Sequence, residues 1–152
     1  MRSTTPMHST RSLRAASRLI AGAALAALMT GCMLFAKPPA DLDYSRTRIS
    51  ESGLYQGTIL PQGDSIPKGK LQRWTLHLEA NGVPVDSAVI KVDGGMPQHG
   101  HGLPTKPAVT RALGGGDHLI EGMKFNMGGW WVVKFRVSSA AGSDSLVFNV
   151  QL

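Results

Sequence analysis

The sequence predicts an all-β fold: an immunoglobulin-like antiparallel β-sandwich that follows an N-terminal signal peptide and a short linker. Apolar and polar residues alternate with a period of two in several short segments, which is typical of half-buried antiparallel strands. Glycine-rich and Asn-Gly turn signals separate these segments. After the N-terminal segment, apolar residues do not recur at helical spacing over a helical length. Six or seven short strands with frequent turns therefore favour a sandwich.

The first 31 residues have the pattern of a lipoprotein signal peptide. Residues 1–18 carry four arginines and no acidic residue, and an apolar, alanine-rich run follows from Leu19 to Leu28. A basic head, a short apolar core and small residues before the cut are typical of secretory signals, whereas a membrane-spanning helix needs about 20 apolar residues. The single cysteine, Cys32, ends a Met-Thr-Gly-Cys tetrapeptide. This resembles the bacterial lipobox, with Met29 where leucine is usual.

We therefore expect a lipid on Cys32 that anchors the protein to a membrane, facing the periplasm within the cell envelope. More than one acyl chain would give firm anchoring. The alternative is an ordinary signal peptide with a chance cysteine. With one cysteine in the chain, no disulfide can form within the mature domain.

The basic character of the chain comes largely from the signal peptide. The whole chain has 16 basic and 10 acidic residues, and without the four signal arginines the balance is 12 against 10. No basic stripe interleaved with aromatic residues follows. Nucleic acid is therefore not an expected partner.

Residues 32–52 are Pro-rich and then mixed polar and charged, without helical or strand periodicity. We expect a tether here, and a single domain over residues 53–152, which is enough for one modest core. The predicted strands, in chain order, are 54–60, 74–79, 88–93, 118–127, 130–137 and 146–152.

Each predicted strand rests on its own pattern. Leu54 to Leu60 is an apolar-rich run before a proline, and Gly122 marks a possible bulge within 118–127. In 74–79 and 130–137 the apolar positions include Trp74 and Trp131, which we expect to fill the centre of the sandwich in place of a disulfide. The segments 88–93 and 146–152 alternate in the same way.

Several motifs resemble the YtkA-like domain family, which is related to the FixH type of membrane-bound assembly proteins. Trp74 opens a strand, and a Pro-Val-x-x-Ala step follows at residues 84–88. Met-Pro-x-His-Gly-His-Gly at 96–102 and Gly-Met-Lys-Phe-Asn-Met-Gly-Gly-Trp at 122–130 complete the pattern. The resemblance covers roughly residues 70–150. It implies an immunoglobulin-like sandwich outside the cytoplasmic membrane, with a role in copper handling or respiratory oxidase assembly.

The same motifs predict a copper site. His99 and His101 stand two residues apart in a Gly- and Pro-rich loop, and on an extended chain both rings leave on one side. Thioether and imidazole ligands suit copper, whereas zinc prefers thiolate, imidazole and carboxylate. The predicted ligands are His99, His101, Met96, Met123 and Met127. The alternative is that the methionines pack the core and the histidines bond loop carbonyls.

A second hypothesis is a non-catalytic interaction module of the cell envelope that binds no metal. The alternation points Trp130 outward, where we expect it to contact a partner such as a membrane protein complex; the alternative is that it packs under the tether. An enzyme is not expected, because no nucleophile arrangement and no Gly-x-Ser-x-Gly elbow appears.

Overall fold

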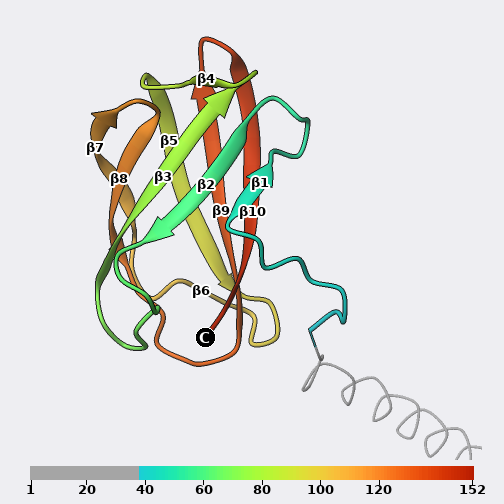
Figure 1. The fold of residues 1–152 in the computed structure, drawn as a ribbon. Coiled ribbons are helices and arrows are strands. Elements are labelled where there is room, and N and C mark those ends of the chain that lie inside the picture. Colours follow the sequence, from blue (N-terminus) through green and yellow to red (C-terminus); the bar gives the residue numbers. More distant parts are fainter. Residues whose placement is uncertain (1–37) are drawn as a thin grey trace, which may run out of the picture. The chain divides into compact units, whose positions relative to one another are not determined.

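The computed structural model describes residues 38–152 (Figure 1). The predicted signal peptide, Cys32 and the first part of the predicted tether lie outside these residues. The chain divides into two units, Met1–Ala36 and Lys37–Leu152, and all the described strands belong to the second. Within residues 38–152, no helix could span a membrane.

The described unit is built from antiparallel β-strands, as the sequence predicted. The strands are β1 (Thr47–Ile49), β2 (Gln56–Pro61), β3 (Gln72–Ala80), β4 (Val83–Pro84), β5 (Ala88–Met96), β6 (His101–Gly102), β7 (Ala108–Gly114), β8 (Asp117–Met123), β9 (Trp130–Ser139) and β10 (Gly142–Gln151).

The strands follow one another in the order β1-β2-β3-β8-β7-β5-β9-β10, with β4 on β3 and β6 on β5. A single pair, Lys91 with Ala108, joins β5 to β7, so the sheet folds into two facing layers at that seam (Figure 1). At the other side Glu51 N donates to Ser145 O at 2.8 Å, which brings the end of β1 beside β10. The sandwich is therefore nearly closed, like a barrel.

The core lies between the two layers and is rich in aromatic side chains. Trp74 and Trp131 are 1% and 0% exposed, which confirms that they fill the centre. Phe125 packs between them, with ring centroids 5.6 Å from Trp74 and 5.2 Å from Trp131. Phe135 and Phe148 form an edge-to-face pair with centroids 5.7 Å apart. These pairs add to the burial of apolar area that holds the layers together.

The turn signals act as their chemistry predicts. Asn81 and Gly82 have φ angles of 51° and 73°, and both positive values match the type I′ turn that suits a two-residue hairpin. They connect β3 to β4.

Part of the predicted tether is folded. Residues 47–49 form β1, which pairs with β2, and Ser50 is 5% exposed. Three residues are too few to display a period of two in the sequence, so composition alone gave no sign of this strand.

The bulge expected at Gly122 is present. Gln72 of β3 pairs with Met123 and Arg73 pairs with Glu121, so Gly122 is the extra residue, and its φ is 86°. His118 and Ile120 point inward before the bulge, and Met123 points inward after it. One extra residue exchanges the two faces of a strand, and this exchange turns Met123 into the core.

Candidate metal site at the β5–β6 hairpin

The β5–β6 hairpin carries three of the predicted ligands. Met96 ends β5 and is the cross-strand partner of His101, so both side chains leave the hairpin on the same face. His99 N and Gly100 N both donate to Met96 O at 3.0 Å, and Gly100 has a φ of 65°. Gly95 pairs with Gly102. A Cβ on Gly95 would meet His101 O at 2.4 Å, so this close approach requires glycine.

The two histidine rings lie against each other. Their centroids are 5.9 Å apart and their planes differ by 24°, and both residues are exposed. His101 Nδ1 lies 3.2 Å from Gly102 O, which leaves its Nε2 for another partner. An imidazole nitrogen binds a metal at about 2.0 Å. Two rings whose centroids are 5.9 Å apart can therefore bind one ion if each turns a nitrogen toward it.

Met96 belongs to the hydrophobic core, at the end of β5. It is 1% exposed, and its Cε is 3.0 Å from the position that a Cβ on Gly129 would take. Met96 and His101 both line a shallow hollow of about 390 Å³ beside the hairpin. Met96 and His101 therefore share one hollow, and the Met96 side chain is shielded from bulk water.

The segment between β8 and β9 closes this end of the sandwich. Met127 is 38% exposed, and its carbonyl accepts a hydrogen bond of 3.1 Å from Trp131 Nε1. Gly129 and Leu152 exchange two backbone hydrogen bonds of 2.9 and 3.1 Å. The ring of Trp131 in turn meets the ring of His101 edge to face, with centroids 5.7 Å apart. The fold thus brings the Met127 segment to the hairpin through Trp131 (Figure 1, lower end).

Met123 does not join this group on the surface. It is 0% exposed and belongs to the hydrophobic core, because the Gly122 bulge turns it inward. Its position matches the core-packing alternative, and we leave Met123 out of the ligand set proposed below.

Trp130 is half-buried and used within the domain. Its Nε1 donates to Asn149 Oδ1 at 3.0 Å, and Asn149 Nδ2 donates to Asp43 O at 3.0 Å. The indole therefore helps to hold the segment before β1 against β10, in line with packing under the tether.

The donor set decides which metal the hairpin could take. Among residues 38–152, no group of three or more His, Cys, Asp and Glu side chains could hold a metal ion. A metal at the hairpin would depend on methionine sulfur as well as imidazole. That combination fits copper, above all Cu(I), better than zinc or calcium.

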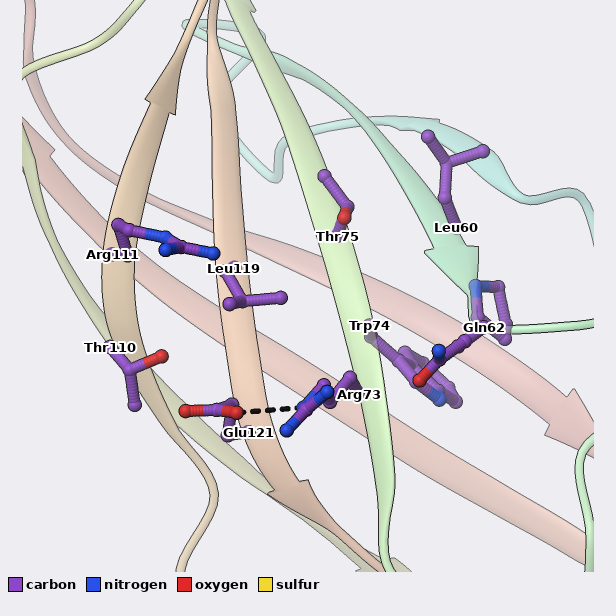
Figure 2. A pocket seen from close by; sticks show the side chains of 10 residues that line it. Leu60, Gln62, Arg73, Trp74, Thr75, Thr110, Arg111, Leu119 and Glu121 are labelled. Carbon is purple, nitrogen blue, oxygen red and sulfur yellow. Dashed lines mark hydrogen bonds and ion pairs between the residues drawn. The ribbon is translucent and has the colours of Figure 1, made fainter.

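Sequence reasoning missed two features on the outer face of β2, β3, β8 and β7. One is an open hollow of about 750 Å³ lined by side chains that include Arg73, Arg111 and Glu121 (Figure 2). The other is His77, whose Nδ1 lies 2.7 Å from Asp117 Oδ1 and whose Nε2 lies 3.3 Å from Glu79 Oε1. Hydrogen bonding to Asp117, and then to Glu79, raises the pKa of His77. Both features depend on strand register, for which the sequence carried no signal.

Comparison with known proteins fits this architecture. The model of the YtkA-like family matches residues 55–136. The chain belongs to the YtkA-like family. The match runs from the residue before β2 into β9, and it includes the β5–β6 hairpin and the segment of Met127. Neither the curated proteins nor the solved structures contain a significant match to this YtkA-like chain.

Proposed function

We propose that this YtkA-like protein is exported, held to a membrane by a lipid on Cys32, and binds copper weakly through the β5–β6 hairpin. Its role would lie in metal handling or respiratory oxidase assembly in the cell envelope, facing the periplasm. The lipobox-like end of the signal sequence supports the anchor. The Met96–His101 pair, with His99 stacked on His101, carries the metal proposal.

The residues that would hold the ion are Met96, His99 and His101, with Met127 as a fourth candidate. Copper bound there would supply a transferable cargo ion. The hairpin contributes two exposed imidazoles that can capture the ion from solvent and one buried thioether that favours the reduced ion. Capture at an exposed loop without a closed cage suits weak binding and transfer to another protein. We propose no catalytic activity.

Copper titration of the purified chain, with metal content measured under oxidising and reducing conditions, tests this proposal. We expect wild type to bind about one ion, and the His99→Ala, His101→Ala double variant to bind at least about tenfold more weakly. Because Trp131 touches His101, its fluorescence should fall as Cu(II) binds to wild type. Met96→Leu keeps the volume of the buried side chain and should lose Cu(I) more than Cu(II).

The matched control is His77→Gln, which removes an imidazole from the outer face of β3. It should leave copper binding unchanged. Equal copper binding by wild type and by the His99, His101 double variant, both folded, would rule out the hairpin as the site.

The alternative is a non-catalytic interaction module that binds no metal. A Trp130→Ala variant that loses capture of an envelope partner, with copper making no difference, would favour it. The hydrogen bond from Trp130 to Asn149 means that this variant needs a parallel measurement of thermal stability.

A further inference from the structure

The outer face of β2, β3, β8 and β7 carries a hollow that the metal proposal does not use. It is open to solvent along the sheet and has a volume of about 750 Å³, which is within the range of known ligand sites. Figure 2 shows Leu60, Thr75 and Leu119 across its floor and Arg73, Arg111 and Glu121 around it. Strand register explains the grouping, because Thr75 pairs with both Leu60 and Leu119, and Leu119 pairs with Arg111.

Arg111 makes no hydrogen bond or ion pair in the part of the chain that the structure describes, although its positive charge helps to lower the pKa of Glu121. Its guanidinium group extends toward Leu119 over the floor of the hollow (Figure 2). An exposed arginine whose guanidinium group makes no hydrogen bond offers its planar donor fork to a ligand.

Arg73 is held by one hydrogen bond, and its terminal nitrogens remain available as donors. Its Nε donates to Glu121 Oε1 at 2.8 Å, and no other hydrogen bond within residues 38–152 uses its guanidinium group. Hydrogen bonds from Thr110 and Arg73 lower the pKa of Glu121, so this carboxylate stays ionised and orients Arg73. Two cations and one anion leave the hollow with a net positive charge.

The chemistry of the hollow matches a carboxylate that is attached to an apolar group. Guanidinium forks bind carboxylates in two parallel hydrogen bonds, and Arg111, Arg73 and Thr75 line the same hollow. Leu60 is 47% exposed and Leu119 is half-buried, so both can cover aliphatic side chains of a ligand. An acidic peptide with apolar residues next to its carboxylates has this composition.

The rest of the same face argues against a continuous polyanion. Beyond Thr75 the outer face continues into His77, Glu79 and Asp117, and Glu121 already lies at the hollow. A nucleic acid strand laid across this face would meet three carboxylates. Between residues 38 and 152 the chain has 11 basic and 10 acidic residues, so no broad positive field would offset this repulsion.

We infer that this hollow binds a short acidic segment of a partner protein. A carboxylate of the segment pairs with Arg111 and the terminal nitrogens of Arg73, and an adjacent apolar side chain rests on Leu119 and Leu60. The site lies apart from the β5–β6 hairpin and shares no lining residue with the hollow there. It therefore does not depend on copper binding.

Fluorescence anisotropy of the full chain with a fluorescein-labelled peptide of alternating leucine and glutamate tests the inference. We expect saturable binding of this peptide and little binding of a matched peptide with glutamine in place of glutamate. Arg111→Gln should raise the Kd at least about fivefold.

Arg136→Gln is the matched control, since it removes an exposed arginine from β9, away from the hollow. It should leave the Kd within about twofold of wild type. Arg111 is exposed and makes no hydrogen bond or ion pair among the described residues, so its variant should keep a melting temperature close to that of wild type. Equal binding by wild type and Arg111→Gln, equal loss in Arg136→Gln, or tighter binding of single-stranded DNA than of the peptide would overturn the inference.

Discussion

On the outer face, strand register brings ionisable side chains from different strands into contact, as His77 shows. His77 lies on β3, where both of its ring nitrogens face carboxylates: Asp117 from β8 and Glu79 from β3 itself. The residue opposite on β2 is the uncharged Thr58. A doubly protonated ring donates to both carboxylates at once, and the pKa of His77 is accordingly raised, mainly by the hydrogen bond to Asp117.

This arrangement predicts a pH-dependent contribution to stability. Because the pKa of His77 is higher in the folded chain than its ordinary value of 6.5, its contribution is complete below that value and is lost as pH rises through the folded pKa. Urea unfolding of wild type and His77→Gln should therefore differ more at about pH 5.5 than at about pH 8.5. A difference that grows toward alkaline pH would contradict this assignment.

At the scale of elements, the sequence predicted the strands whose faces alternate and missed those whose faces do not. Strand β7 was missed because its pairing with β8 shifts register twice and nearly all its residues are exposed. The hairpin site was predictable in part, because Met96, His99 and His101 are neighbours in the chain. The approach of Trp131 to His101 and the grouping of Arg73 with Arg111 come from pairing between distant segments, and no local pattern encodes them.

The turn between β7 and β8 contains Gly116, whose contribution to stability can be tested by substitution. Gly116 has a φ of 84°, its carbonyl accepts from Leu78 N at 2.8 Å, and its N donates to Asp86 Oδ1 at 2.6 Å. A Cβ there would lie 2.6 Å from Leu78 O. Gly116→Ala should destabilise the fold by about 1–3 kcal/mol, measured by chemical unfolding.

Gly115→Ala serves as the comparison, since its φ of 63° is also positive but a Cβ would meet nothing within 4 Å. Gly115→Ala should lower the free energy of unfolding less than Gly116→Ala does. Both variants strain the backbone, but only the second places a Cβ against Leu78 O. Equal losses of stability in the two variants would mean that the steric contact with Leu78 O does not contribute to the effect of Gly116→Ala.

At the scale of the whole described unit, one carboxylate holds the two outer strands of the sandwich together. Asp144 on β10 accepts hydrogen bonds from Ser52 N at 3.0 Å and Leu54 N at 3.3 Å. Its hydrogen bond with Ser50, followed by those from the backbone amides of Ser145, Ser52 and Leu54, lowers its pKa to about 2. The segment between β1 and β2 is thereby attached to β10, where the sheet would otherwise have two open edges.

This closure gives the last prediction. Since the pKa of Asp144 falls from 3.8 to about 2 on folding, its contribution is present above pH 3.8 and is lost as pH falls through about 2. Asp144→Asn should therefore be less stable than wild type at neutral pH, with the difference shrinking as the acid limit is approached. Thermal unfolding across that range measures it, with Asp64→Asn in the β2–β3 loop as control. If the difference in stability between wild type and Asp144→Asn is unchanged at about pH 2, then the shape of the side chain, and not the charge of the carboxylate, closes the sandwich.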